Sequence, residues 1–142
     1  MAHRDLKLEN VIVTSKVTLD TVILDFGFAE KINIFKLMSK AGTPGYIAPE
    51  VFENQPYTDK GDVFALGVIY YSMVSGKSPF KGRDYKEIMQ SNKLAEVTFS
   101  KTNFDGVSSD CQDLIKAMME KDPVKRLNFD QVLQNPVNFF VH

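Results

Sequence analysis

The sequence contains a single cysteine, Cys111, and no tryptophan among its 142 residues. One cysteine cannot form an intrachain disulfide, so we expect Cys111 to be a buried free thiol in a reducing compartment, the cytoplasm or the nucleus. No apolar run approaches the roughly 20 residues that a membrane-spanning helix needs. Arg4 and Asp5 interrupt the apolar core that a signal peptide would require.

An excess of charge of one sign is also lacking, since the net charge is -1. A basic surface for nucleic acid is therefore not predicted. Repeats and low-complexity segments are absent from the sequence as well. The hydrophobic share of 44% and the charged share of 25% are typical of a globular domain. A chain of this length can bury a core of its own as one domain.

Polar side chains that can carry chemistry gather near the start of the chain. Residues 3–10 read HRDLKLEN, which places an acid, a base and an amide within a few positions. Two short apolar runs follow, at 11–13 and 22–24, separated by a polar segment at 15–20. Apolar runs of this length, with turn residues between them, predict a β-hairpin over 11–27.

The predicted hairpin brings two oxygen-bearing side chains together, because Asn10 precedes its first strand and Asp25 follows its second. Oxygen ligands suit Mg²⁺, which proteins usually hold with one or two carboxylates plus substrate phosphates. Asp5 would lie beside this pair and could accept a proton from an attacking hydroxyl.

Helical spacing of apolar residues dominates the rest of the chain. The strongest helix, over 62–75, is apolar on nearly every side and is expected to be buried, and Gly76 ends it. Residues 28–40 show no clear periodicity and are expected to form a loop. The predicted helices cover residues 49–54, 62–75, 84–92, 109–120 and 129–134.

Three motifs in fixed order carry a resemblance to a known family. HRDLKLEN, then Asp25-Phe26-Gly27, then Ala48-Pro49-Glu50 resemble the catalytic-loop, DFG and APE motifs of eukaryotic protein kinases. The stretches GTPGYIAPE and GVIYYSMVSGKSPF look most like the calcium/calmodulin-dependent group. The resemblance implies an α+β, protein-kinase-like fold whose C-terminal lobe is mainly helical, with a short β-hairpin at its start.

By the same resemblance, residues 1–142 form a partial kinase domain. The family's Gly-rich phosphate loop, strand lysine and paired glutamate all precede the catalytic loop, so we expect the N-terminal lobe to be absent and the chain alone to be inactive. The expected parts are the catalytic loop at 3–10, the β-hairpin at 11–27, the activation segment at 25–50 and the helical subdomain at 51–142.

The resemblance also implies catalytic roles. Asp5 resembles the catalytic base, Lys7 the lysine that contacts the transferred phosphoryl group, and Asn10 and Asp25 the Mg²⁺ ligands. In the plainer alternatives, Asp5 caps a loop and Lys7 is a surface lysine. Asn10 then caps the hairpin, and Asp25 is a turn residue. The residues expected to contact ATP are Lys7, Glu9, Asn10, Ile12 beneath the adenine ring, and Asp25.

Regulatory roles are implied for residues near the same motifs. Arg4 precedes the catalytic aspartate, as in kinases controlled by phosphorylation, and phosphate on Ser39 could pair with it; a plain loop serine is the alternative. Phe26 resembles the switch phenylalanine that stacks on His3. Ordinary strand core is the alternative for Phe26, His3 and Ile12.

Other matches concern support of the loop and the substrate. Glu50 should form a buried pair with Arg126, and Asp62 should hold the backbone of the catalytic loop. Thr43 is expected to contact the catalytic aspartate. Together, Thr43 and Lys7 are typical of serine/threonine kinases. Segment 45–47 resembles the wall that receives the substrate residue after the phosphoacceptor.

The function expected from the resemblance is transfer of the ATP γ-phosphate to protein hydroxyls. Its partners would be ATP, Mg²⁺ and protein substrates. A non-catalytic scaffold derived from a kinase is the alternative, and the APE motif argues against a small-molecule phosphotransferase. In the family, the helix that precedes the catalytic loop packs on the buried helix at 62–75; without it, we expect an uncovered apolar stripe, and hence aggregation. Its members are Phe64, Leu66, Ile69, Tyr70 and Met73.

Overall fold

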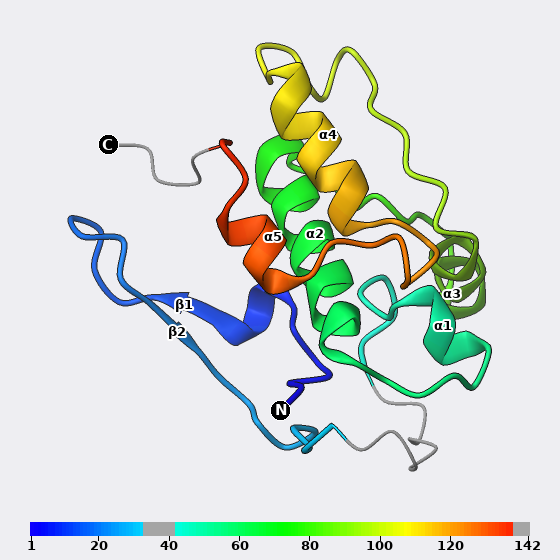
Figure 1. The fold of residues 1–142 in the computed structure, drawn as a ribbon. Coiled ribbons are helices and arrows are strands. Elements are labelled where there is room, and N and C mark those ends of the chain that lie inside the picture. Colours follow the sequence, from blue (N-terminus) through cyan, green and yellow to red (C-terminus); the bar gives the residue numbers. More distant parts are fainter. Residues whose placement is uncertain (33–41, 138–142) are drawn as a thin grey trace.

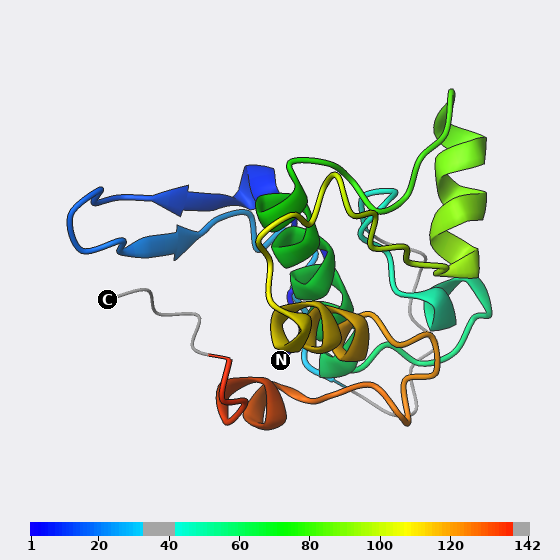
Figure 2. The same cartoon turned by 90° about the horizontal axis from the view of Figure 1, so that it is seen from above.

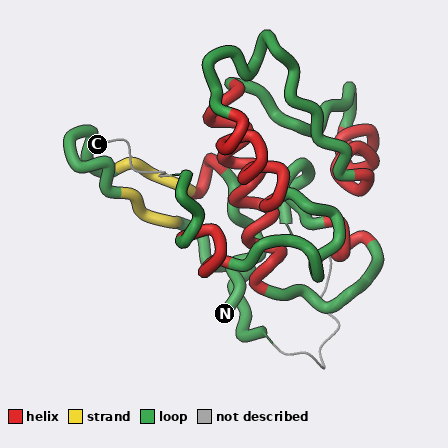
Figure 3. The backbone as a smooth tube through the Cα atoms, turned by 45° about the horizontal axis from the view of Figure 1, so that its top comes forward, coloured by secondary structure: helices red, strands yellow, loops and turns green. Residues whose placement is uncertain are grey.

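A computed structural model describes residues 1–32 and 42–137 of the chain. Residues 33–41 and 138–142 lie outside this part, and they include the predicted phosphosite Ser39. A two-stranded hairpin projects from a body of helices, as Figures 1 and 3 show. This arrangement confirms the predicted fold class, a mainly helical unit that begins with a short hairpin.

The hairpin forms where the two apolar runs predict it. Strand β1, Val11–Val13, pairs antiparallel with strand β2, Thr21–Ile23, with Val11 opposite Ile23. Every residue of the two strands is β-branched, which suits a pleated ribbon. A short 3-10 helix, Leu8–Asn10, precedes β1 within the stretch that was predicted to be a loop.

Both faces of the hairpin are open. Ile12 and Val22, which face each other in the register, are each 45% exposed. The ribbon leaves the helical body at its base, where Val11 packs against Leu6 and against Ala65 and Ile69 of α2, and its far end projects away from the helices (Figure 2). Reading Ile12 as ordinary strand core is therefore wrong, because two strands alone have nothing to pack against.

Helix α2, Asp59–Ser75, is the centre of the body (Figure 1). It begins three residues before the predicted start because the side chain of Thr58 accepts a hydrogen bond from the Lys60 amide and so caps it. It ends as predicted at Gly76, whose φ of 68° is the left-handed conformation that glycine adopts easily.

The described part of the chain has four further α-helices. Helix α1 is Pro49–Phe52, α3 is Tyr85–Leu94, α4 is Ser109–Met118 and α5 is Phe129–Leu133. Helices α4 and α5 pack on α2, whereas α3 stands apart from α2 beside α1 (Figure 2). Asp84, Ser108 and Asn128 cap α3, α4 and α5 with side-chain oxygens. None of the described helices combines the length and the apolar character needed to span a membrane.

The core lies between α2 and α4. Phe64 is fully buried against Phe80, Ile115 and Met119, and Cys111 lies in the same cluster as a buried free thiol. The predicted uncovered stripe on α2 is therefore wrong for Phe64, and also for Ile69, which Leu6 of the catalytic loop covers. Met73 does lie bare, at 69% exposure.

Candidate active site

Asp5 lies at the centre of a closed polar network. Its Oδ1 accepts a hydrogen bond of 2.7 Å from Thr43 Oγ1, and its Oδ2 accepts one of 2.9 Å from Lys7 Nζ. Lys7 Nζ also donates to Thr43 Oγ1 over 2.9 Å. The hydrogen bond to Asp5 raises the pKa of Lys7 above its usual value, against the opposing effect of burial. Lys7 is therefore a cation at neutral pH, beside a buried carboxylate.

Asp62, in the first turn of α2, holds the backbone that leads to Asp5. Its Oδ2 accepts from the His3 amide over 2.7 Å, and its Oδ1 accepts from the Arg4 amide over 2.9 Å. Tyr57 donates its hydroxyl to the same carboxylate over 2.9 Å. Arg4 has a φ of 72°, which non-glycine residues seldom adopt, and these bonds compensate its cost. Burial, with the Asp62 charge next, raises the pKa of Tyr57.

The hairpin register brings Asn10 and Asp25 to the same end of the ribbon. The Leu24 amide donates to the Asn10 carbonyl over 2.8 Å, so Asp25 follows one residue beyond this pair. Asn10 is buried, and its Nδ2 donates to the Asp5 carbonyl over 2.9 Å, so Oδ1 is the atom of that amide that could bind a metal. Asp25 is exposed, with a φ of 59°.

An amide oxygen and a carboxylate fit Mg²⁺, a hard cation that prefers oxygen ligands. In residues 1–32 and 42–137, no group of three or more His, Cys, Asp or Glu side chains could hold a metal. Asn10 and Asp25 would then need oxygens from a substrate to complete the coordination, as Mg²⁺ sites in phosphate-transferring enzymes do.

His3 links the loop, the hairpin and Phe26. Its Nε2 donates to the Leu24 carbonyl over 3.0 Å, while its Nδ1 accepts from the Asp5 amide over 3.3 Å. The two roles together require the neutral ring with its proton on Nε2. The ring centroids of His3 and Phe26 lie 4.9 Å apart, so the expected contact is present, but the rings are tilted by 59° and are not stacked.

Arg4 forms an ion pair that the sequence reading missed. Its Nη1 lies 2.7 Å from Oε2 of Glu30, and Glu30 also pairs with Ala2 in an isolated β-bridge. An ion pair thus connects Arg4 to Glu30, four residues after Phe26. The predicted partner Ser39 lies outside the described residues, so its pairing with Arg4 stays a prediction.

Glu50 and Arg126 meet in a buried bidentate pair, with both N–O distances at 2.7 Å. The Arg126 guanidinium also donates to the carbonyls of Lys60, Glu120 and Lys121, and it lies over the Phe64 ring at 5.0 Å. The pair joins α1, at the end of the predicted activation segment, to the segment before α5.

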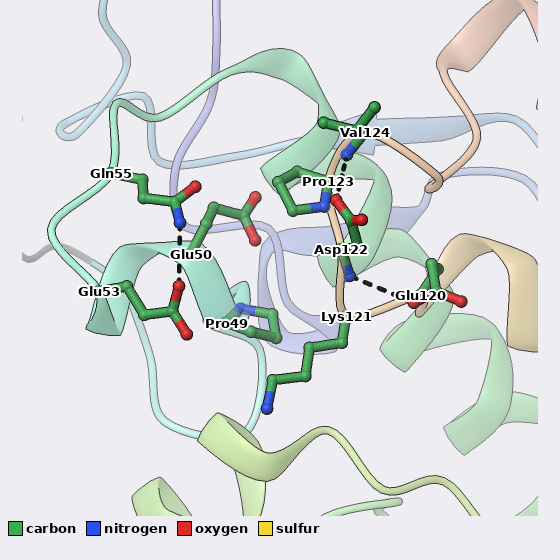
Figure 4. A pocket seen from close by; sticks show the side chains of 9 residues that line it. All are labelled: Pro49, Glu50, Glu53, Gln55, Glu120, Lys121, Asp122, Pro123 and Val124. Atoms are coloured by element: carbon green, nitrogen blue, oxygen red, sulfur yellow. Dashed lines mark hydrogen bonds between the residues drawn. The ribbon is translucent and has the colours of Figure 1, made fainter.

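Glu9 and Ile12, two of the residues expected to bind nucleotide, lie exposed near Asn10. A cavity of about 520 Å³ lies elsewhere, between α1 and the segment after α4, and Glu50 is the one predicted site residue that lines it (Figure 4). The surface predicted to bind the nucleotide, at Glu9 and Ile12, is thus exposed to solvent and does not lie in this cavity.

The sequence reading also missed Asn92, a fully buried residue of α3. Its Nδ2 donates to the Ile47 carbonyl over 2.8 Å, and its Oδ1 accepts from the Gly45 amide over 3.0 Å. A signal was present, because Asn92 follows Ile88 by four residues and so shares its face of the helix. The sequence alone did not show what this face packs against.

Comparison with known proteins adds independent evidence. A family model described as protein kinase domain matches residues 1–138. Calcium/calmodulin-dependent protein kinase type I of Schizosaccharomyces pombe is 39% identical over 140 residues, which cover 96% of this chain and 42% of the relative. Myosin light chain kinase, smooth muscle, of Gallus gallus is 36% identical over 137 residues, which cover 96% of this chain and 7% of the relative. The chain thus spans less than half the length of these relatives.

Proposed function

This chain belongs to the protein kinase family, as a protein serine/threonine kinase by descent, and from that premise we propose that it carries the catalytic-loop half of a site that transfers the γ-phosphate of ATP to serine or threonine hydroxyls. The network of Asp5, Lys7 and Thr43 is the observation that carries the proposal.

Each member of the network has a chemical role in this proposal. The Asp5 carboxylate orients the acceptor hydroxyl and takes its proton as the hydroxyl attacks. The Lys7 ammonium, held as a cation by Asp5, stabilises negative charge on the phosphoryl oxygens as they pass to the acceptor. Thr43 fixes the Asp5 carboxylate from the side of the activation segment, so the base is positioned before substrate arrives.

Asn10 and Asp25 are proposed to hold Mg²⁺ through one amide oxygen and one carboxylate oxygen. The ion, when bound with ATP, neutralises phosphate charge. Asn10 is fixed to the Asp5 carbonyl, so the metal ligand and the catalytic base move as one unit. Phe26 on His3 and the Arg4–Glu30 pair connect this unit to the segment after Asp25, where Ser39 is the proposed regulatory phosphosite.

The proposed partners are ATP and protein substrates, in the cytoplasm or the nucleus. A buried free thiol at Cys111 fits a reducing compartment. Acceptor choice tests the function: the natural protein that carries this sequence is incubated with Mg·ATP and peptides that differ only in a serine, threonine or tyrosine acceptor. We expect serine and threonine to be labelled and a chelator of Mg²⁺ to stop labelling. Labelling of tyrosine alone would contradict the assignment of Lys7 and Thr43.

A non-catalytic binding module is the second candidate, and the open hairpin favours it. Ile12 and Asp25 are exposed, so residues 1–142 by themselves would hold a nucleotide from one side only. We therefore propose that these 142 residues alone have little kinase activity. Transfer at about one turnover per second, within the usual kinase range, and abolished by Asp5→Asn, would contradict this.

A further inference from the structure

The segment after Thr43 is a tight turn, and the Gly45 amide within it has no hydrogen-bond acceptor in the turn itself. The Tyr46 amide donates to the Thr43 carbonyl over 3.0 Å, and Gly45 has a φ of 91°. Pro44 followed by a residue of positive φ is the pattern of a type II turn. In such a turn the hydrogen bond that closes it uses the Tyr46 amide, so the Gly45 amide must find another acceptor.

Asn92 of α3 supplies that acceptor and more. Its Oδ1 accepts from the Gly45 amide over 3.0 Å, and its Nδ2 donates to the Ile47 carbonyl over 2.8 Å. The side-chain amide of Asn92 thus forms hydrogen bonds with the Gly45 amide and the Ile47 carbonyl, in the way that the backbone of a neighbouring strand would. Asn92 has no solvent exposure, so loss of its amide would leave the buried Gly45 amide and the part-buried Ile47 carbonyl without this partner.

Packing reinforces the two hydrogen bonds. A Cβ atom built on Gly45 would lie 3.9 Å from Cγ2 of Ile88, so α3 also meets the turn through an apolar side chain one helical turn before Asn92. The other end of the segment is fixed to the catalytic base by the 2.7 Å bond from Thr43 to Asp5. The stretch from Thr43 to Ile47 is thus held between the base and α3.

We propose that Asn92 is a positioning residue that fixes segment 45–47 relative to Asp5 and thereby sets which side chain is accepted directly after the phosphoacceptor. The inference rests on the proposed function, which assigns segment 45–47 as the wall for that substrate residue. Asn92 touches neither the acceptor nor the nucleotide in this assignment. It acts through the backbone of Gly45 and Ile47.

Peptide kinetics on the natural protein that carries this sequence test the inference. Asn92→Ala removes both hydrogen bonds, and Asn92→Leu removes them while it keeps the side-chain volume that supports folding. Gln90→Ala is the matched control, since Gln90 is an exposed amide on the same helix. The substrates are serine peptides that differ only in the next residue, isoleucine, glycine or aspartate.

For both Asn92 variants we expect the peptide KM to rise about tenfold, because a tenfold change corresponds to about 1.4 kcal/mol, the order of the two lost hydrogen bonds. The preference among the three peptides should fall by a similar factor. The kcat and the KM for ATP should stay near those of wild type, since the interaction lost is one of peptide binding. Gln90→Ala should match wild type throughout.

Unchanged peptide preference in both Asn92 variants would overturn the inference, and so would a fall in kcat that only follows the folded fraction. A wild-type protein that labels no peptide would contradict the proposed function instead. Hydrogen exchange of the Gly45 amide then tests the contact itself. Faster exchange in both Asn92 variants than in Gln90→Ala supports the positioning role, and equal exchange overturns it.

Discussion

The hairpin and the helical body are both built from apolar residues, yet they bury them to opposite extents. Phe64 of α2 has no exposed surface, whereas Phe26, just after the hairpin, is 55% exposed. Helix α2 packs against α4, α5 and Leu6, while the two strands pair with each other and contact the body at their base through Val11. An apolar run is therefore buried only where other elements bring surfaces to cover it.

The proposed active site lies where these two regions join. Asp5 and Asn10 are buried and held by the body through Asp62 and Thr43. Asp25, on the hairpin side, is exposed. The proposed catalytic base thus depends on the stability of the body, whereas Asp25, the second proposed metal ligand, depends on how the hairpin is placed. Substitutions in the two regions should have separable effects.

The largest effect on stability should come from Arg126→Ala in the body. It leaves the Glu50 carboxylate buried without its partner and removes the donors to three carbonyl groups. Breaking such a buried pair costs about 3–5 kcal/mol, and chemical denaturation measures the loss. Arg83→Ala is the control, because it removes an exposed ion pair with Glu87 and should leave the denaturation midpoint unchanged. Equal shifts for the two variants would refute the importance given to the buried pair.

A matched pair of phenylalanines tests the comparison directly. Phe64→Ala should lower the free energy of unfolding by about 3–5 kcal/mol, because it empties a well-packed site next to Phe80 and Arg126. Phe26→Ala should cost far less, since its ring lies largely in solvent. Similar losses in urea denaturation would mean that the hairpin side is packed as firmly as the body.

Valines in the two regions give a smaller and more specific contrast. Val13→Thr and Val22→Thr remove exposed apolar surface, so the fluorescence of a hydrophobic dye should fall. The melting temperature should shift by only about 1–2 °C, as surface substitutions change stability by about 0.5 kcal/mol or less. Val63→Thr, at a fully buried position of α2, should lower it clearly more. Unchanged dye binding in the hairpin variants would place the bare apolar surface elsewhere.

The local elements and the motif residues could be predicted from the sequence because each depends on neighbours along the chain. A stretch that is apolar on nearly every side of a helix marked α2, and the glycine after it marked its end, but the cap by Thr58 moved its start. The motif at 3–10 drew attention to Asp5, Lys7 and Asn10, whose catalytic roles stay predictions. The exposed state of Ile12 could not be read from the sequence, because burial depends on elements far away.

Contacts between distant segments were the main omission. Glu30 pairs with Arg4 and Asn92 binds the turn at Gly45, and neither residue stands out by type or spacing. Their roles depend on how loops and α3 pack, which a single sequence does not specify. Glu50 and Arg126 are just as distant, but the family resemblance supplied their pairing in advance.

Phosphate transfer by Asp5→Asn in the natural protein that carries this sequence tests the central claim most directly. The measurement is initial transfer from Mg·ATP to a serine peptide, with Asp110→Asn, an exposed aspartate of α4, as the control. We predict that Asp5→Asn, in protein that is still folded, loses about 10²–10⁴-fold in rate, the usual contribution of a positioned base, while the control keeps the wild-type rate. Wild-type transfer by folded Asp5→Asn protein would contradict the account.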